Sequence, residues 1–264
     1  MSETLWRLSV FIGVLLLMVL WELVSPKRKP RYKRRQRWPA NLAIVAVDNL
    51  LLRIVAPAGL VGVALFASEK SLGLFHALTV NLPFWLTVVI SIVLLDIAIY
   101  WQHRLFHRVP VLWRMHRVHH ADPDFDVTTG LRFHPAEIVL SFFIKGATIL
   151  VLGAPALAVV LFEIILNACS LFNHGNVELP KPLEKIVRKI LITQELHRIH
   201  HSVEKEETNS NYGFSVSWWD HLFDSFTDRP KAGSDNIDIG LRDYRDSKIT
   251  TKLWELLKIP FKRD

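Results

Sequence analysis

HRVHH at residues 116–120 and HRIHH at residues 197–201 are the same pentapeptide with one conservative change. Both copies lie beyond long apolar stretches of the chain. On a helix, positions i, i+3 and i+4 share a face, so each copy presents three imidazoles in one direction. Imidazoles near lipid are costly unless they have a partner. The fold therefore has to bring both pentapeptides to a partner, and the rest of the sequence indicates which kind.

Four more histidines accompany the two pentapeptides. HRLFH at 103–107 places two imidazoles at i and i+4, and single histidines follow in RFHPAE and LFNHGN. The ten candidate metal ligands are His103, His107, His116, His119, His120, His134, His174, His197, His200 and His201. Clustered imidazoles without a metal would leave polar groups unmatched and would repel one another once protonated. The set therefore predicts metal binding, whereas His76 and His221 are interpreted as structural residues.

The number of histidines indicates the kind of metal site. The chain has a single cysteine, Cys169, which excludes a disulfide within the chain and argues against cysteine ligands. A tetrahedral zinc site takes four ligands, so ten imidazoles fit two metals with open positions better. Imidazole also binds copper, nickel and zinc, and a haem between helices would need two histidines. The count favours a dinuclear, non-haem site.

The two pentapeptides share a basic residue at their second position. These residues are Arg117 and Arg198. Because a guanidinium has no lone pair to offer, neither arginine can be a ligand. We expect both side chains to point away from the metals, toward water, phosphate or carboxylates.

The apolar stretches predict an all-α, polytopic membrane bundle. Half of the residues are hydrophobic (50%), and the segments 5–24, 40–67 and 83–102 are each long enough to cross a bilayer. Residues 136–172 read as two helices that turn at GAP, 153–155. The bundle then has four or five spans, because the hairpin either crosses the membrane or dips into it. A cleaved signal at 5–24 is disfavoured, since no basic segment precedes it and no small-residue cleavage site follows.

The distribution of charge predicts the orientation of this bundle. The chain has a net charge of +7, and the segment PKRKPRYKRRQRWP (26–39) has eight Lys or Arg and no acid. By the positive-inside rule this loop faces the cytoplasm. Counting spans from it places 103–135 and 173–264 on the same side, with every histidine except His76. We therefore predict a cytoplasmic, histidine-rich, metal-binding cap. A nucleic-acid-binding arm is the alternative for 26–39, but the flanking apolar segments argue against a nucleic-acid partner.

Two later segments mix apolar and basic residues at helical spacing. They are LEKIVRKILI (183–192) and TKLWELLKI (251–259). Each predicts either a helix in the headgroup plane or an ordinary helix packed in the cap. Taken together, the patterns divide the chain into N-terminal spans with a basic loop (1–82), a catalytic domain (83–228) and a C-terminal cytoplasmic or interfacial tail (229–264).

The order of the histidine motifs between apolar spans resembles the fatty acid hydroxylase/sterol desaturase superfamily. The resemblance includes the segments around the histidines. They are DIAIYWQHRLFH (96–107), LWRMHRVHHADPDFDVTTGLRFHPAE (112–137), LFNHGNVELP (171–180) and HRIHHSVEKEETNSNYGFSVSWWDHLFDSF (197–226). It covers about residues 83–228, and its motifs agree in type, order and spacing.

This resemblance implies a diiron enzyme that uses O2 to act on a lipid. It implies that the eight histidines of three histidine boxes, HRLFH, HRVHH and HRIHH, are iron ligands, with His134 and His174 as the ninth and tenth. Polar residues near the boxes are expected to orient the imidazole N–H groups. These are Asp96, Asp122, Glu137, Asn173, Glu195, Asn211 and Asp220. We expect Asp96 and Glu137 to be the strongest of these candidates, because they flank ligands at span ends.

The function expected from these features is hydroxylation or desaturation of a membrane lipid, such as a sterol or a fatty acyl chain. The sequence shows no flavin, nicotinamide or fused cytochrome b5 signature, so two electrons are expected from a separate ferredoxin- or cytochrome b5-type partner. The expected location is the bacterial inner membrane or the endoplasmic reticulum. Two alternatives are a zinc-dependent membrane hydrolase and a metal transporter or sensor. The first needs fewer histidines, and the second should place its ligands near the membrane midplane.

Overall fold

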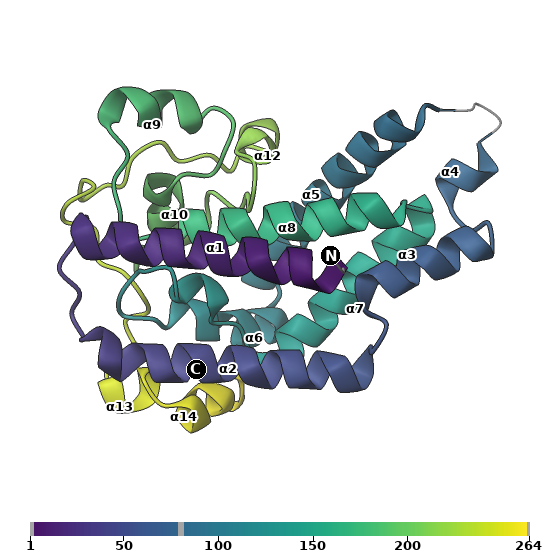
Figure 1. Cartoon of the computed structure of the whole chain (residues 1–264). Helices are drawn as coiled ribbons and strands as arrows, with labels where there is room; N and C mark the ends of the chain where they lie inside the picture. Colours follow the sequence, from purple (N-terminus) through teal and green to yellow (C-terminus); the bar gives the residue numbers. More distant parts are fainter. Residues whose placement is uncertain (1–2, 79–81, 263–264) are drawn as a thin grey trace.

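Long apolar helices dominate the computed structural model, which describes residues 3–78 and 82–262 (Figure 1). Within those ranges there is no strand, apart from two isolated bridges, Leu191 to Val216 and Ser202 to Ile239. Five segments are long and apolar enough to cross a membrane: Leu5–Val24, Arg34–Ala77, Phe84–Arg108, Pro135–Leu152 and Ala156–Asn173. The prediction of an all-α membrane bundle is therefore confirmed.

The segment 34–77 is broken, contrary to the single span predicted at 40–67. Helix α2 (Arg34–Val55) starts earlier, and α3 (Gly59–Glu69) continues it after a break, followed by the short α4 (Leu74–Ala77). Pro57 lies in the break, where its ring and missing N–H prevent an unbroken helix. Gly59 enters α3 with a φ of 61°, which favours glycine.

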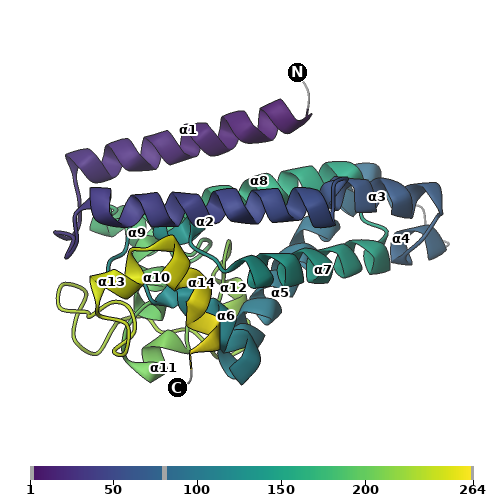
Figure 2. The same cartoon turned by 90° about the horizontal axis from the view of Figure 1, so that it is seen from below.

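The other spans follow the sequence more closely. Helix α1 (Glu3–Val24) packs against α8 (Ala156–Asn173), and α2 packs against α7 (Pro135–Leu152) (Figures 1 and 2). The predicted hairpin is confirmed: Gly153 ends α7 with a φ of 68°, and α8 returns after Pro155. A Cβ at Gly153 would lie 2.4 Å from the Leu72 carbonyl oxygen, so the turn also packs against the chain before α4.

The fifth long helix carries the first histidine motif beyond the membrane-like part of the bundle. Helix α5 (Phe84–Arg108) is six residues longer at its C-terminal end than the predicted span 83–102, because HRLFH continues its last turns. Helix α6 (Pro110–His120) starts at once, with Pro110 at its first turn, where a missing N–H costs nothing. The core between α3, α5, α7 and α8 includes Leu95, Ile149 and Phe162, which are at most 1% exposed.

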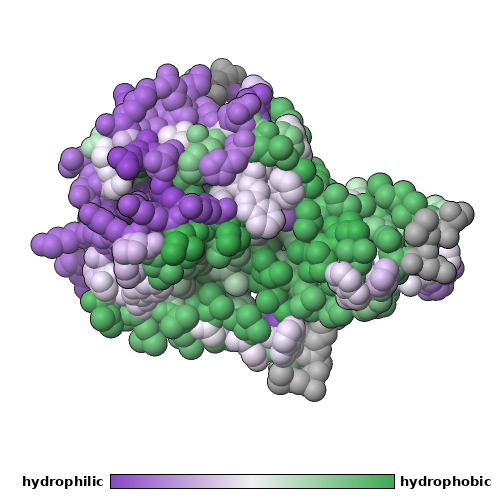
Figure 3. Space-filling view, turned by 90° about the horizontal axis from the view of Figure 1, so that it is seen from above, coloured by the Kyte–Doolittle hydropathy of each residue, from purple (hydrophilic) through white to green (hydrophobic). Residues whose placement is uncertain are grey.

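Short helices form a cap at one end of the bundle, while α3 and α4 lie toward the other end (Figures 1 and 2). The cap helices are α9 (Lys181–Val187), α10 (Gln194–His200), α11 (Lys205–Thr208), α12 (Trp218–Leu222), α13 (Ser247–Thr250) and α14 (Leu253–Lys258), with 3-10 turns at Thr129–Leu131 and Ile259–Phe261. Hydrophilic residues gather over this cap, and hydrophobic residues cover the long helices (Figure 3). The surface therefore divides into a membrane-like part and a polar part.

The two amphipathic segments have different roles. Helix α14 packs in the cap core, because Leu256 and Ile259 are fully buried in a cluster with Ala40 and Ile44 of α2. Helix α9 ends at Val187, short of the predicted 192, and Ile186 beside it is 64% exposed. The core-packing interpretation is thus the correct one for 251–259.

A buried ion network fixes α2 to the segment that follows α6. Arg37 donates to Asp122 from Nε and Nη2, at 2.8 and 2.7 Å, and to Asp126 from Nη1, at 2.6 Å. Arg37 and Asp122 are fully buried. Burial alone would raise the pKa of Asp122, but the charges of Arg37 and Arg132 outweigh it and hold that pKa below its usual range. The network therefore exists as charged groups that neutralise one another.

We predict that Arg37→Gln destabilises the protein by about 3–5 kcal/mol, because it leaves buried carboxylates without their cation. The thermal unfolding midpoint of the detergent-solubilised protein measures this loss. Arg35→Gln, an exposed position on the same helix, is the matched control and should leave the midpoint nearly unchanged. Equal midpoints for the two variants would contradict the role given to the network.

Candidate metal centre

Nine of the ten candidate histidines meet in two groups inside the cap. Site A consists of His103, His107, His116, His120 and His200. Site B consists of His119, His174, His197 and His201. In each group the candidate ligand nitrogens all lie within 4.8 Å of one another. Each group is compact enough for its imidazoles to share one metal ion.

The repeated pentapeptides do not form one site each. HRVHH gives His116 and His120 to site A but His119 to site B. HRIHH gives His200 to site A but His197 and His201 to site B. Around a helix, the side chains of residues i+3 and i+4 lie on either side of residue i. One short helix can therefore direct its histidines to two centres that lie side by side. The two motifs therefore interleave and join both sites into one unit.

Three helix ends and one helix cap aim the imidazoles. His103 and His107 share a face of the last turns of α5. Helix α6 begins directly after Val109 and brings His116 next to His103. Thr193 is the N-cap residue of α10, and its hydroxyl accepts from the Leu196 N–H at 3.5 Å. His174 is the C-cap residue of α8. The ends of α5, α6, α8 and α10 thus supply all nine histidines, with His201 following α10.

Gly130 allows His174 to reach its position in site B. A Cβ added at Gly130 would lie 2.9 Å from His174 Nδ1 and 2.8 Å from the Ser170 carbonyl oxygen. A larger residue would push the 3-10 turn at Thr129–Leu131 away from the end of α8. The close approach at Gly130 therefore holds His174 near the other histidines of site B.

Hydrogen bonds to one ring nitrogen set the role of the other. Nδ1 of His103 lies 2.8 Å from the Tyr212 carbonyl oxygen, and Nδ1 of His200 lies 2.7 Å from that of Ser210. His174 Nδ1 lies 2.8 Å from the Ser170 carbonyl oxygen. Because a carbonyl only accepts, each Nδ1 must carry the proton and each Nε2 keeps a lone pair. These Nε2 atoms are therefore prepared to bind a metal.

The lone pairs converge on one another. His103 Nε2 lies 3.1 Å from His116 Nε2 in site A. His174 Nε2 lies 3.1 Å from His119 Nε2 and 3.0 Å from His197 Nε2 in site B. Two neutral acceptors at this distance, as in the pair of His103 and His116, are unfavourable by themselves and suit a cation between them. Both ring nitrogens of His107, His120 and His201 are buried and have no hydrogen-bond partner among the described residues.

Burial keeps these imidazoles neutral, which is the form that binds metal. It lowers the pKa of His116 to about 3 and, as the largest cause, that of His174 to about 3 as well. Burial, followed by neighbouring imidazoles, holds the pKa of His119, His120 and His201 well below the usual range. The same holds for His197 and His200. The donor set therefore fits metal ions held by neutral nitrogen ligands.

His134 lies outside both groups, so the structure does not bring the expected tenth ligand to the other nine histidines. Its Nδ1 accepts from the Ala136 N–H at 3.1 Å, which makes it the N-cap of α7. Its Nε2 lies 3.3 Å from the Leu257 carbonyl oxygen. The imidazole thus joins a span to the C-terminal segment. Pro135 at the first helical position and Glu137 in the first turn are typical of a helix start, and this signal was present in the sequence.

Among the polar candidates, Glu137 is the one that contacts a site histidine directly. Its Oε1 lies 2.7 Å from His116 Nδ1, and both side chains are buried. A carboxylate at this nitrogen fixes the ring and increases the basicity of Nε2. Glu137 is therefore placed to orient the His116 ring, which is the role that the sequence suggested for it.

Asp220 and Asn211 act on the sites through the backbone. Asp220 accepts from the N–H groups of Tyr212 and Gly213, at 2.7 and 2.8 Å, and so holds the carbonyl that orients His103. Asn211 has a φ of 49° and donates to the Leu196 carbonyl oxygen at 3.1 Å. Both residues position the loop between α11 and α12 over site A.

The other four candidates bind elsewhere. Asp122 belongs to the Arg37 network, and Asp96 accepts from the Trp219 indole at 2.8 Å. Asn173 donates to the Phe214 carbonyl oxygen at 2.8 Å. Glu195 lies 3.9 Å from Arg188. These residues join α2, α5 and α8 to the cap, so they support the fold around the sites and do not touch an imidazole.

The shared arginines point away from the sites, as expected, and their contacts include backbone carbonyls. Arg117 donates from Nη2 to the carbonyl oxygens of Ile259 and Lys262, at 2.8 and 2.6 Å. Arg198 lies over the Phe125 ring, with its Cζ 5.4 Å from the ring centroid. Both are nearly fully buried, so the expectation of water around them is wrong. The cap is thick enough to enclose the outer face of each pentapeptide.

Aromatic rings and backbone carbonyls complete the centre, and sequence reasoning did not find them. Phe133 stacks on His119 with centroids 4.4 Å apart, and Phe125 stacks on His174 at 5.6 Å. These rings exclude water from site B. The nearby motif residues offered a weak signal for the phenylalanines, but the carbonyl acceptors at Tyr212, Ser210 and Ser170 have none, because every residue carries a carbonyl.

Comparison with known proteins supplies a family. The fatty acid hydroxylase family model matches residues 88–225. Ornithine lipid hydroxylase OlsE of Rhizobium tropici is 28% identical over 239 residues, which are 89% of this chain and 71% of that protein. Human alkylglycerol monooxygenase is 28% identical over 136 residues, 50% of this chain and 28% of that protein. Fatty acid hydroxylase vlmA of Lecanicillium is 26% identical over 174 residues, 60% of this chain and 47% of that protein. No solved structure matches the chain.

The matched segment covers more than half of the chain and includes every histidine of sites A and B. It also includes Glu137, Asn211 and Asp220, which position the imidazoles. An integral-membrane bundle that gathers these residues at one end agrees with the match. The chain therefore belongs to the fatty acid hydroxylase family.

Proposed function

We propose that this protein is an integral-membrane hydroxylase that uses O2 to oxidise a membrane lipid, with one iron ion in each histidine site. The observation that carries this proposal is the pair of interleaved sites, made of nine imidazoles, eight of them buried, at one end of an apolar bundle. Two iron ions held there would supply the activation of O2. Neutral imidazole ligands suit iron used in oxygen chemistry.

The protein's own groups would hold and shield that chemistry. Glu137 and the carbonyls of Tyr212, Ser210 and Ser170 would keep the proton on Nδ1 of their imidazoles. Phe133 and Phe125 would exclude water from site B, so that the oxidation of the lipid would be shielded from solvent. The long helices bring both sites to the membrane, where a lipid is available.

The relatives support a lipid substrate and hydroxylation. Ornithine lipid hydroxylase and alkylglycerol monooxygenase are named for adding oxygen to lipids. Oxygen insertion is therefore favoured over desaturation for this chain. Because it spans 28% of the length of alkylglycerol monooxygenase, the substrate of that protein is not transferred to it.

The orientation and the electron donor are part of the same proposal. The basic loop 26–39 favours a cytoplasmic position for the cap. A reduced ferredoxin- or cytochrome b5-type protein would then supply two electrons from that side. A zinc hydrolase would leave at least five of the nine imidazoles without a role. A transporter would place its ligands near midplane, whereas these lie at helix ends.

We predict that the purified protein binds about two metal ions per chain, one in each site. His107→Ala in site A and His201→Ala in site B should each reduce the metal content, and the double variant should lose both ions. Elemental analysis by mass spectrometry measures this. His134→Ala is the matched control and should keep both metals, because His134 caps α7. Loss of a metal in His134→Ala would restore it as a ligand.

We predict that Glu137→Gln weakens metal binding at site A by about 10–100-fold, since the amide no longer fixes His116 as a carboxylate does. Competition with a chelator gives the affinity of each site. Glu195→Gln, which changes a carboxylate that does not contact an imidazole, is the control. An equal loss in both variants would argue against direct orientation of His116.

We predict that the iron-loaded protein, with a reductant and O2, converts a membrane lipid to a product heavier by one oxygen atom. Lipid mass spectrometry with labelled O2 should show that the added atom comes from O2. The reaction should stop without O2, and the double variant of the metal experiment should be inactive. Activity under strict anaerobiosis would overturn the proposed function and favour hydrolysis.

A further inference from the structure

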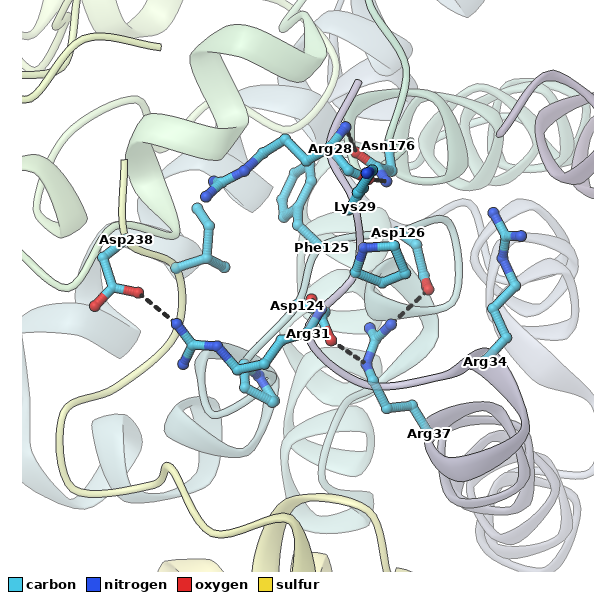
Figure 4. A pocket seen from close by; sticks show the side chains of 13 residues that line it. Arg28, Lys29, Arg31, Arg34, Arg37, Asp124, Phe125, Asp126, Asn176 and Asp238 are labelled. Carbon is cyan, nitrogen blue, oxygen red and sulfur yellow. Dashed lines mark hydrogen bonds and ion pairs between the residues drawn. The ribbon is translucent and has the colours of Figure 1, made fainter. Parts of the chain in front are cut away.

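A basic cavity lies beside site B and has no part in the function proposed above. It has a volume of about 300 Å³ and lies between the loop joining α1 to α2, the segment 123–126, and Asp238 with Ile239 (Figure 4). Five basic residues line it: Arg28, Lys29, Arg31, Arg34 and Arg37. Three acidic residues also line it: Asp124, Asp126 and Asp238. The lining therefore has an excess of positive charge.

The carboxylates of the cavity already have partners. Asp124 accepts from the N–H groups of Arg31 and Tyr32, at 2.6 and 2.8 Å. Asp126 accepts from Arg37 at 2.6 Å. Asp238 accepts from Arg245 at 2.8 Å and from Arg31 at 3.3 Å (Figure 4). The acidic groups are thus committed to holding the walls together and do not neutralise the rest of the lining.

The cations at one side of the cavity are less satisfied. Arg28 Nη1 is a buried atom with no hydrogen-bond partner in the part of the chain that the structure describes. Burial lowers the pKa of Arg28, which means that its charge lacks full compensation. Lys29 is exposed at the rim and forms no salt bridge with any described carboxylate. A buried guanidinium nitrogen without an acceptor is expensive, so an anion supplied from outside would stabilise it.

A second guanidinium lies behind the cavity wall. Arg198 is 2% exposed, and its Nε and Nη1 have no partner among the described residues. It lies over Phe125, which lines the cavity. One incompletely satisfied arginine, Arg28, therefore lines the cavity, and a second, Arg198, lies behind its Phe125 wall; both add to the positive potential inside the cavity.

The position of the cavity indicates where its ligand comes from. The loop that forms it follows directly on α1, whose last residues are apolar and exposed: Leu20 is 59% exposed, Leu23 56% and Val24 85%. Such a face belongs in lipid, so the loop from Ser25 onward enters the headgroup layer. Phosphate and carboxylate groups of lipids are concentrated at this level.

We propose that this cavity binds the phosphate or carboxylate group of an anionic membrane lipid, through Arg28 and Lys29. Phe125 forms part of the cavity wall, and its ring centroid lies 5.2 Å from that of His201 and 5.6 Å from that of His174. A headgroup bound here is therefore one aromatic ring away from site B. The inference concerns the binding of a headgroup and not the reaction. It can therefore be wrong while the proposed hydroxylation is correct, and it can be correct while the proposed hydroxylation is wrong.

The test is lipid binding by the full-length protein, purified in detergent and loaded with metal but given no reductant. Native mass spectrometry measures binding of phosphatidylglycerol, which is anionic, and of phosphatidylcholine, which is zwitterionic. The wild-type protein should bind phosphatidylglycerol at least about tenfold more tightly, because charge-assisted hydrogen bonds would form with one lipid and not the other. Equal affinities would overturn the proposal.

Two double variants with the same change of charge separate the cavity from the loop around it. Arg28→Gln with Lys29→Gln removes two cavity charges, and affinity for phosphatidylglycerol should fall about tenfold or more. Lys33→Gln with Arg35→Gln removes two exposed charges of the same basic segment that do not line the cavity. This control should change affinity by less than about twofold. Equal losses would mean general attraction of the loop and would overturn a built site.

Inorganic phosphate and an acidic protein distinguish other occupants. Phosphate at millimolar concentration should displace phosphatidylglycerol from the wild-type protein, which tests the cavity without any substitution. Phosphate binding that needs Arg28 and Lys29, without lipid binding, would overturn the lipid source in favour of a free anion. If the cavity variant instead lost binding of a reduced ferredoxin and kept its lipid, the cavity would be a protein docking site and the proposal would be wrong.

Discussion

The rest of the structure depends on keeping nine imidazoles, eight of them buried, neutral and aimed at two points. A charged imidazole in this interior would repel its neighbours and lose its lone pair, so the protein has to control the proton on each ring. It does so with fixed acceptors: a carboxylate for His116 and backbone carbonyls for His103, His174 and His200. Carbonyls serve well in this position, because they accept the hydrogen bond of an imidazole N–H without adding charge among the imidazoles.

The interleaving of the sites explains the architecture around them. Site A takes residues from α5, α6 and α10, and site B from α6, α8, α10 and the residue after it. Four helix ends must therefore arrive together, and the short helices and loops of the cap hold them there. The Arg37 network ties α2 to the segment after α6, while Asp220 and Asn211 shape the loop over site A. Spans and cap form one structure, because the histidines belong to both.

Charge is sorted outward from this neutral centre. Beyond the imidazoles come aromatic rings, then buried arginines that bind carbonyls or carboxylates, and then the exposed basic loop. Arg117 and Arg198, which stand between histidines of the two sites in sequence, lie on the outer side of their helices. A helix that directs the imidazoles at i, i+3 and i+4 toward the sites carries residue i+1, the arginine, on a different face. The basic cavity is a consequence of the same order, since it lies where the outer cations meet the headgroup layer.

The sequence by itself determined the helical membrane class, the turn at Gly153, the grouping of histidines at one end, and Glu137 as a partner of one of those histidines. Those features follow from local periodicity, from helix-ending residues and from which side of a span a segment lies on. Only the tertiary structure decided that nine histidines divide into five and four, that each pentapeptide serves both sites, and that His134 caps α7 instead of joining them. It also decided the break at Pro57 and the carbonyl acceptors. A sequence gives the face on which a side chain lies, but the rotation and meeting of helices depend on contacts such as Arg37 with Asp122, between residues far apart in the chain.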